Sequence, residues 1–178
     1  MKKDEKNKAL FLDRDGTINV EKNYVYKIED FEFQPGIFDL IQSYQKEGYL
    51  IFIITNQSGI AREIYSENDY LQLTDWMLGQ FSKKGIIIEK GYYCPHHPGI
   101  TGPCLCRKPR PGMILEAIET FSIDPKQSVL IGNNERDLQA GQSAGIGKNL
   151  YIQHLLRDIK KQTEQAGETF YTGRNTIY

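Results

Sequence analysis

The segment ALFLDRDGT, residues 9–17, is the best guide to the fold class. A short apolar run, Ala9–Leu12, leads directly into two acidic residues, Asp13 and Asp15, and then into the turn-forming pair Gly16–Thr17. Such a run, bounded by turn residues, is typical of a strand that is buried on both faces of a parallel sheet. Ligands bind beside the carboxyl ends of such strands, so the acidic pair lies where a functional site is expected.

Apolar runs of this kind recur along the chain and alternate with segments of helical periodicity. This alternation predicts βαβ units, and therefore a three-layer, Rossmann-like α/β fold with a central parallel sheet. The length of 178 residues suits a single domain, residues 1–178. The predicted strands are residues 9–13, 49–55, 86–94, 128–133 and 149–152.

Local signals mark several helix ends between these strands. Proline suits the first helical turn, so Pro35 and Pro111 mark two helix starts, and Ser66 opens a capping box at a third. Gly145 ends a short helix that contains residues 140–144. The apolar side chains expected to face the sheet are Ile37, Leu40, Ile41 and Tyr44 in the first helix, Leu73, Met77 and Phe81 in the second, and Ile114, Leu115, Ile118 and Phe121 in the third.

The composition is that of an ordinary globular protein, with 39% hydrophobic and 25% charged residues. Its net charge of -1 lacks the basic excess of nucleic-acid-binding proteins, so we expect no nucleic acid partner. The N-terminal apolar stretch and the longest apolar run, residues 49–54, are too short for a signal peptide or a membrane span. We therefore expect a cytoplasmic monomer with no membrane partner, whose polar tail after His154 starts as a helix and then frays.

The spacing of Asp13 and Asp15 suits metal and phosphate chemistry. One carboxylate at the strand end and a second in the turn after it can share a Mg²⁺ ion, which prefers oxygen ligands. An aspartate can also attack phosphorus and form an aspartyl-phosphate. An ordinary Asp-rich turn is the simpler alternative, but the buried strand before the pair and the Gly-Thr turn after it favour a functional site.

Two further segments suit the binding of phosphate. TNQSGIAR, residues 55–62, follows the second strand, and its hydroxyl and successive backbone N–H groups can bind phosphate oxygens. An ordinary polar turn is the alternative. Arg107 and Lys108 can offset the negative charge that develops on a transferring phosphoryl group, unless they are simply two solvated charges.

The segment GYYCPHHPGITGPCLCRKPRPG, residues 91–112, contains every cysteine and two of the three histidines. In a reducing compartment, clustered cysteines are more often metal ligands or catalytic groups than disulfides. A C-x-H pair and a C-x-C pair separated by a loop can form a tetrahedral zinc site, which would be structural because four protein ligands leave no open position. His97 is the competing ligand, and buried cysteines without metal are the simpler alternative. The predicted zinc ligands are Cys94, His96, Cys104 and Cys106.

With these segments in view, the chain resembles the haloacid dehalogenase-like (HAD) phosphatases. The four matching segments are FLDRDGTIN (residues 11–19), IITNQSGI (53–60), RKP (107–109) and IGNNERD (131–137). Within that superfamily, the zinc loop and residues 10–145 as a whole are similar to the branch that acts on heptose 1,7-bisphosphate. Histidinol-phosphate phosphatases share the zinc loop and are the alternative. The resemblance implies a phosphoric monoester hydrolase with a HAD fold, Mg²⁺, structural zinc, a small phosphorylated sugar as substrate, and no large cap domain.

Carried over position by position, the resemblance makes Asp13 the nucleophile and a Mg²⁺ ligand. Asp15 becomes the general acid and base, with its carbonyl oxygen on the metal. Thr55 and Lys108 would stabilise the transferring phosphoryl group, and Asn133 would complete the metal site. The residues that would bind substrate are Glu21, Lys22, Asn23, Tyr24, Asn56, Gln57, Ser58, Arg107 and Asn134.

The chain departs from the HAD pattern at two places. An Asp and a Lys usually stand where this chain has Asn133 and Asn134. A neutral amide oxygen should hold Mg²⁺ more weakly than a carboxylate, which keeps a third hypothesis open, a zinc-stabilised phosphate-binding module without turnover. Asp137 is then expected to orient a metal-bound water. The zinc loop is also shorter than in the heptose enzymes, which bears on the sugar phosphate that fits. The gaps between the four motifs are too short for a large cap domain, so we expect the zinc loop and residues 19–33 to form the whole rim of the site.

Overall fold

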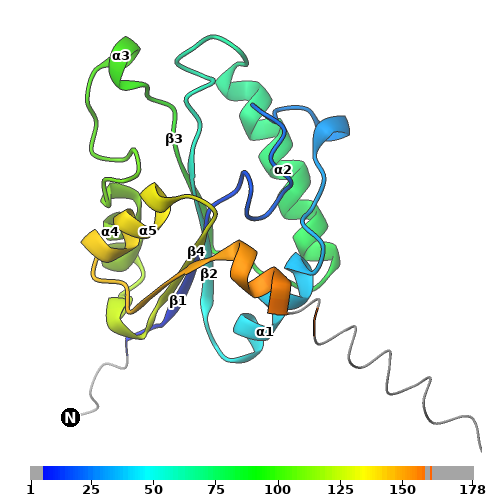
Figure 1. The fold of residues 1–178 in the computed structure, drawn as a ribbon, viewed down its shortest axis with the longest axis vertical. Coiled ribbons are helices and arrows are strands. Elements are labelled where there is room, and N and C mark those ends of the chain that lie inside the picture. Colours follow the sequence, from blue (N-terminus) through cyan, green and yellow to red (C-terminus); the bar gives the residue numbers. More distant parts are fainter. Residues whose placement is uncertain (1–5, 159–160, 162–178) are drawn as a thin grey trace, which may run out of the picture.

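The computed structural model describes residues 6–158 and 161, and the five strands of this part form one sheet (Figure 1). The strands are β1 (Ala9–Leu12), β2 (Leu50–Asn56), β3 (Lys90–Cys94), β4 (Val129–Gly132) and β5 (Lys148–Tyr151). Their order in the sheet is β3-β2-β1-β4-β5, and every pairing is parallel. β1 is therefore central, with β2 and β4 as its neighbours.

Helices cover both faces of the sheet. They are α1 (Ile37–Lys46), α2 (Glu67–Lys83), α3 (Pro98–Thr101), α4 (Gly112–Thr120) and α5 (Glu135–Ser143), with short 3₁₀ helices η1 (Ile28–Asp30) and η2 (Pro125–Gln127). α1 and α2 lie on one face, and α4 and α5 lie on the other (Figure 1). Residues 152–158 are also helical and pack on the face that carries α1. These three layers confirm the predicted α/β fold with a central parallel sheet.

The side chains of β1 alternate between two apolar clusters, one on each face of the sheet. Leu10 and Leu12 pack with residues of α1 and α2, whereas Ala9 and Phe11 pack with residues of α4 and α5. Because both faces are covered, every position of the strand is buried, and the sequence is a continuous apolar run. The polar residues that follow the run emerge at the carboxyl edge of the sheet.

The third strand is shorter than predicted. We expected residues 86–94, but β3 begins at Lys90. Ile86 is buried in the cluster under α1 and α2, while Ile87 is 64% exposed and its backbone N–H donates to the side chain of Gln45 at 2.7 Å. This segment connects α2 to the strand by packing and side-chain contacts, and its first backbone hydrogen bond to β2 is the one from the Glu89 N–H to the Ile51 carbonyl oxygen, at 2.8 Å.

The prediction that Leu115 faces the sheet is wrong, because its side chain is 47% exposed. Successive residues of a helix point about 100° apart, and Ile114 already occupies the inward face together with Met113 and Ala117. The capping box at Ser66 is confirmed.

The last helix before Gly145 is longer than predicted and begins at Glu135. The helical start predicted for the tail is confirmed over residues 152–158, and its fraying end lies outside the described residues. None of the helices in the described ranges has the length and hydrophobicity to traverse a lipid bilayer.

Candidate active site

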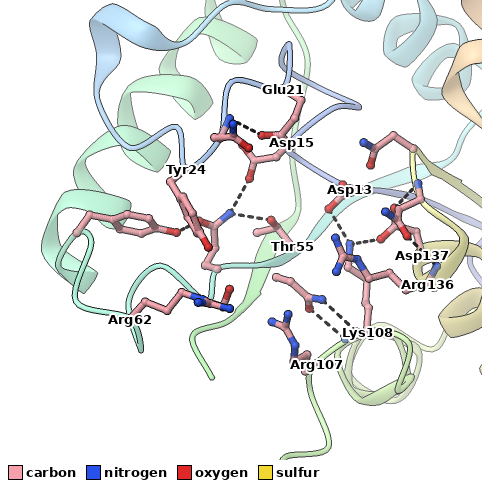
Figure 2. A pocket seen from close by; sticks show the side chains of 17 residues that line it. Asp13, Asp15, Glu21, Tyr24, Thr55, Arg62, Arg107, Lys108, Arg136 and Asp137 are labelled. Carbon is pink, nitrogen blue, oxygen red and sulfur yellow. Dashed lines mark hydrogen bonds and ion pairs between the residues drawn. The ribbon is translucent and has the colours of Figure 1, made fainter. Parts of the chain in front are cut away.

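The carboxyl ends of β1, β2 and β4 open into one pocket of about 440 Å³, a volume typical of small-molecule sites (Figure 2). Asp13 and Asp15 follow β1, Thr55 lies near the end of β2, and Asn133 follows β4. Lys108 reaches the same pocket from the loop before α4. The fold therefore brings together the side chains that the sequence predicted to be catalytic or to bind Mg²⁺.

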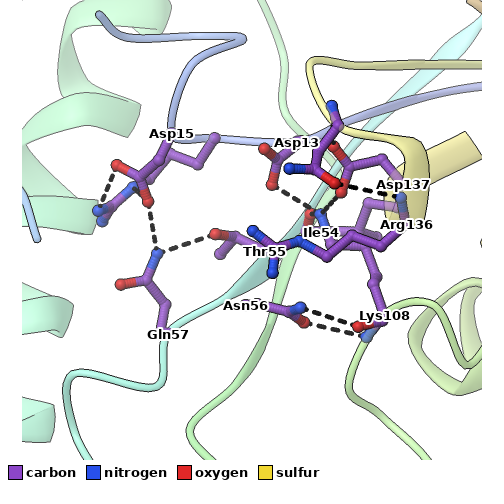
Figure 3. Close-up of polar contacts among 11 residues, drawn as sticks. Asp13, Asp15, Ile54, Thr55, Asn56, Gln57, Lys108, Arg136 and Asp137 are labelled. Carbon is purple, nitrogen blue, oxygen red and sulfur yellow. Dashed lines mark hydrogen bonds and ion pairs between the residues drawn. The ribbon is translucent and has the colours of Figure 1, made fainter. Parts of the chain in front are cut away.

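The buried Lys108 amino group contacts three oxygen atoms (Figure 3). Its Nζ lies 2.6 Å from Asp13 Oδ1 and 2.7 Å from Asp137 Oδ1, and it donates to the carbonyl oxygen of Ile54 at 2.8 Å. Burial alone would lower the pKa of Lys108, but the two carboxylates outweigh this effect and raise it. The lysine therefore stays charged next to Asp13.

The pKa of Asp13 is raised to about 7. Burial is the main cause and Asp137 acts in the same direction, whereas Lys108 opposes both. A divalent cation beside the carboxylate would favour its ionised form, which is the form that can act as a nucleophile. The environment of Asp13 is therefore suited to metal-assisted chemistry.

Asn56 joins the loop that carries Lys108 to the end of β2. Its Nδ2 donates to the Lys108 carbonyl oxygen at 3.1 Å, and the Lys108 backbone N–H donates to Asn56 Oδ1 at 3.0 Å. Nearby, Gln57 Nε2 donates to Thr55 Oγ1 at 2.8 Å and to Asp15 Oδ2 at 3.0 Å. The Asp15 side chain points toward Gln57 and away from Asp13 (Figure 3).

Three oxygen-bearing groups converge where the resemblance implies Mg²⁺. In one orientation of the Asn133 amide, its nitrogen donates to Asp13 Oδ2 at 3.1 Å and to the Asp15 carbonyl oxygen at 3.2 Å. In the reversed orientation the amide oxygen takes that position, beside two other oxygens. Adjacent ligands of octahedral Mg²⁺ with bonds of about 2.1 Å are about 3 Å apart, so these residues fit the ion.

Gly16 makes room for the Asn133 amide. The backbone of Gly16 has a φ of +82°, and a Cβ atom there would lie 2.0 Å from Asn133 Nδ2. Any larger residue would displace the amide from Asp13 and Asp15.

The four predicted zinc ligands form a compact cluster. Their Sγ and Nδ1 atoms all lie within 4.8 Å of one another. The shortest separation is 2.9 Å, between Cys106 and Cys94, and His96 Nδ1 lies 3.3 Å from Cys106 Sγ. Tetrahedral zinc with bonds of about 2.0–2.3 Å holds its ligand atoms between about 3.3 and 3.8 Å apart, so the cluster needs only small adjustments to bind the ion.

The cysteines of this cluster differ in acidity. Burial raises the pKa of Cys94. Burial also acts to raise the pKa of Cys104, but hydrogen bonds from the Arg107 backbone and from the neighbouring thiols outweigh it and lower the pKa to about 7. Zinc binds thiolates, so Cys104 is the thiol best prepared for a metal.

His97, the competing ligand, lies outside the cluster. It caps α3, where its Nδ1 accepts a hydrogen bond from the Gly99 backbone N–H at 3.2 Å. Its Nε2 lies 2.8 Å from Arg62 Nη2. Both ring nitrogens are therefore engaged away from the cysteines.

Most of the residues expected to bind substrate line the pocket. They are Glu21, Asn23, Tyr24, Asn56, Gln57, Ser58, Arg107 and Asn134. Lys22 is not among them, because its side chain points to an exposed ion pair with Glu32, at 3.0 Å. Asp137, expected to orient a metal-bound water, contacts Lys108 and caps α5 by accepting a hydrogen bond from the Asn134 backbone N–H.

Sequence reasoning missed several residues of this site. Arg62, Tyr65 and Arg136 also line the pocket, and Arg14 contacts Asp15. Arg62 and Arg136 belong to the segments TNQSGIAR and IGNNERD, so their place in those motifs was the available signal.

The fold and the site are those of a HAD-like hydrolase, and the HAD-hydrolase-like family model matches residues 105–152. D-glycero-alpha-D-manno-heptose-1,7-bisphosphate 7-phosphatase of Campylobacter jejuni is 56% identical to this chain over 147 residues, which is 83% of each protein. The chain belongs to this family of HAD-like phosphatases, and the predicted resemblance is confirmed.

Two further relatives support this assignment. D-glycero-beta-D-manno-heptose-1,7-bisphosphate 7-phosphatase of Haemophilus influenzae is 44% identical over 150 residues, 82% of each protein. The crystal structure of D,D-heptose 1,7-bisphosphate phosphatase from B. bronchiseptica, complexed with magnesium and phosphate, superposes with a TM-score of 0.73. It is 30% identical and the match covers 79% of this chain and 78% of that one. The fold similarity therefore comes with substantial sequence identity.

Proposed function

We propose that this protein is a Mg²⁺-dependent phosphatase that hydrolyses the 7-phosphate of D-glycero-D-manno-heptose 1,7-bisphosphate. The main observation behind this proposal is the pair of contacts made by the Asp13 carboxylate. One of its oxygens lies 2.6 Å from the buried Lys108 amino group, and the other belongs to the oxygen set that fits Mg²⁺. The names of the relatives at 56% and 44% identity support the choice of substrate.

The reaction proceeds in two steps on the chain's own carboxylates. Asp13 attacks phosphorus and forms an aspartyl-phosphate while the bond from phosphorus to the sugar oxygen breaks, and Asp15 donates a proton to that oxygen. Asp15 then takes a proton from water, whose oxygen attacks phosphorus, and the bond to Asp13 breaks to release inorganic phosphate. Mg²⁺, held by Asp13, the Asp15 carbonyl and Asn133, would supply positive charge for the phosphoryl oxygens.

Lys108 and Thr55 stabilise the charge on the phosphoryl group as it transfers. Lys108 is fixed by Asp13, Asp137 and the Ile54 carbonyl, so little reorganisation is needed when the charge develops. The Thr55 hydroxyl accepts a hydrogen bond from Gln57, which leaves its own proton available for a phosphate oxygen.

The Cys₃His cluster would hold zinc in a structural role. Two hydrogen bonds connect the segment around this cluster to the pocket. Arg107, next to Lys108, donates from Nη1 to the His96 carbonyl oxygen at 3.2 Å, and Gln57, directly after β2, donates its backbone N–H to the Cys94 carbonyl oxygen at 2.8 Å. Since the segment 91–112 is rich in Gly and Pro, it cannot form an apolar core of its own. Zinc would thus keep Lys108 in place.

A substrate comparison tests the proposal. Purified protein with saturating Mg²⁺ is given each anomer of heptose 1,7-bisphosphate and, separately, histidinol phosphate, and phosphate release is measured. We expect kcat/KM for a heptose bisphosphate to exceed that for histidinol phosphate by at least about 100-fold. Histidinol phosphate lacks the sugar hydroxyl groups, so polar groups of the site that bind them would be left without a hydrogen-bond partner. Phosphorus NMR of the product should show the 1-phosphate intact. Preference for histidinol phosphate, or no turnover of either anomer, would contradict the assigned substrate.

A further inference from the structure

Arg14, between the two motif aspartates, is buried and only 1% exposed. Its Nε donates to Asp15 Oδ2 at 3.1 Å and its Nη2 donates to Asp15 Oδ1 at 2.9 Å. A guanidinium that binds both oxygens of a carboxylate fixes the position and the plane of that carboxylate. Since Lys108 contacts Asp13, each motif aspartate has a buried cation of its own.

Arg14 also connects Asp15 to the rim of the pocket. The same Nη2 donates to the carbonyl oxygen of Val25 at 2.7 Å. Val25 is a buried residue of the segment 19–33, which includes the pocket-lining residues that follow β1. The guanidinium lies 5.7 Å from the centre of the Tyr70 ring in α2. One side chain thus joins Asp15, the rim segment and α2.

The remaining contacts of Asp15 are neutral. Asn19 Nδ2 donates to its Oδ1 at 3.2 Å, and Gln57 Nε2 donates to its Oδ2 at 3.0 Å. Because Gln57 also donates to Thr55 Oγ1, this amide connects Asp15 to the part of the pocket expected to bind phosphate. Among the described residues, Arg14 is the only cation in an ion pair with Asp15.

Stability alone is a weak reason for this arrangement. A buried Arg–carboxylate pair is desolvated at a cost that its attraction roughly offsets, and well-packed apolar residues often stabilise a core as well or better. In addition, Arg14 Nη1 is buried without a hydrogen-bond partner among the described residues. The pair is better explained by the orientation that it imposes on Asp15.

We propose that Arg14 is a positioning residue for the acid–base step, holding the Asp15 carboxylate in the orientation from which it exchanges a proton with the leaving oxygen and with water. This inference rests on the proposed function, in which Asp15 is the general acid and base. Arg14 itself touches neither the substrate nor the reacting atoms.

The test compares two leaving groups. A sugar alkoxide needs a proton as it departs, whereas p-nitrophenolate leaves readily without one. Arg14→Met should therefore lower kcat/KM, which reports the step in which the leaving group departs, on the order of 100-fold for the sugar phosphate, the usual contribution of general acid–base catalysis, and by less than about fivefold for p-nitrophenyl phosphate. Arg14→Lys, which keeps the charge but lacks the planar fork, should recover part of the loss on the sugar phosphate.

A double-mutant cycle separates this role from a merely structural one. Asp15→Asn should show the same dependence on the leaving group, and adding Arg14→Met to it should cost no further activity if Arg14 acts through Asp15. Arg157→Met, at an exposed position outside the pocket, is the matched control and should leave both activities unchanged. Circular dichroism melting checks that each variant is folded. If Arg14→Met does not fold, the comparison of leaving groups is made with Arg14→Lys.

Equal losses in kcat/KM for both leaving groups, or additive losses in the double variant, would overturn the positioning role. The proposed function fails in a different way, namely if the wild-type protein hydrolyses p-nitrophenyl phosphate but no heptose bisphosphate. In that case the comparison of leaving groups is made between p-nitrophenyl phosphate and the alkyl phosphate that the wild type hydrolyses fastest in a substrate screen. A wild-type protein that hydrolyses neither kind of ester overturns both.

Discussion

Asn133 is the residue at which the metal site differs most from the HAD pattern. Its amide can present either a donor or an acceptor to Asp13 and to the Asp15 carbonyl, and only the acceptor suits a cation. Without metal the donor orientation is favourable, because it makes two hydrogen bonds. Mg²⁺ would be bound by the acceptor orientation, at the expense of these two hydrogen bonds.

Asn133→Asp should bind Mg²⁺ more tightly, on the order of tenfold, because a second negative charge joins that of Asp13 in the ligand set. Without metal, the new carboxylate repels Asp13, so the variant should melt at a lower temperature and gain more from added Mg²⁺. Titration calorimetry and melting curves with and without Mg²⁺ measure both effects. Unchanged affinity would show that the Asn133 amide binds Mg²⁺ as well as a carboxylate does. A large gain in turnover would favour the hypothesis that the wild-type protein binds phosphate but has little catalytic activity.

Asp13→Asn should abolish the nucleophile with little effect on the fold. Lys108 keeps its contacts with Asp137 and the Ile54 carbonyl, and the new amide is close in shape to the carboxylate. Phosphate release should fall at least about a thousandfold, as when a covalent nucleophile is removed. Trapping with fluoroberyllate, which forms an analogue of the phosphorylated carboxylate, should also be lost. A variant that retains this trapping would mean that another group accepts the phosphoryl.

At the scale of elements, the segment 91–112 joins the Cys₃His cluster to Lys108, the lysine of the proposed active site. The segment closes on itself where the Gly112 backbone N–H donates to the Leu105 carbonyl oxygen at 3.2 Å. A Cβ atom on Gly112 would lie 2.3 Å from that oxygen, so only glycine allows this approach. The loop is thus held by backbone contacts at its end and by the cluster in its middle.

Cys104→Ser should lose zinc and loosen this loop. The purified wild type is expected to contain one zinc per chain by elemental analysis, and the variant close to none. Since Lys108 depends on the loop, turnover should fall at least about tenfold and protease sensitivity should rise within residues 91–112. His97→Ala is the matched control, because His97 contacts Gly99 and Arg62 and should leave the zinc content unchanged. Absence of zinc from the wild type would contradict the structural metal site.

Strand positions and the strand tips were predictable, because a fully buried parallel strand needs an uninterrupted apolar run and the polar residue after it must emerge at the sheet edge. The same rule failed at residues 86–88, an apolar run that does not belong to the sheet although Ile86 is buried. Arg14 was missed for a related reason. An arginine between two aspartates has the pattern of solvated charges, and only the fold reveals that Arg14 is enclosed between β1, the rim and α2. Lys22 shows the opposite error. It was predicted to bind substrate because it follows the first motif, but its side chain pairs with Glu32 and does not line the pocket.

At the scale of the whole molecule, charge is distributed unevenly. The net charge is only -1, yet Arg62, Arg107 and Arg136 all line the one pocket described above, together with the buried Lys108. The carboxylates of Asp13, Asp15, Glu21 and Asp137 line the same pocket, so its acidic and basic side chains are equal in number, and the three arginines attract an anion only over short distances. A substrate with two phosphates should be able to pair one of them with these arginines while the other lies at Asp13, whereas a substrate with a single phosphate cannot.

The variant Arg62→Gln/Arg136→Gln should therefore lower kcat/KM for heptose 1,7-bisphosphate about fivefold and change it less for a heptose monophosphate. Both residues are exposed, so the loss should appear mainly in KM and should shrink as salt screens the charges over about 8 Å at physiological ionic strength. Lys46→Gln, an exposed lysine outside the pocket, changes the net charge without changing the local field and should have no effect. Steady-state kinetics at several salt concentrations decide the matter: equal losses for the two substrates would mean that the arginines shape the pocket without recognising the second phosphate.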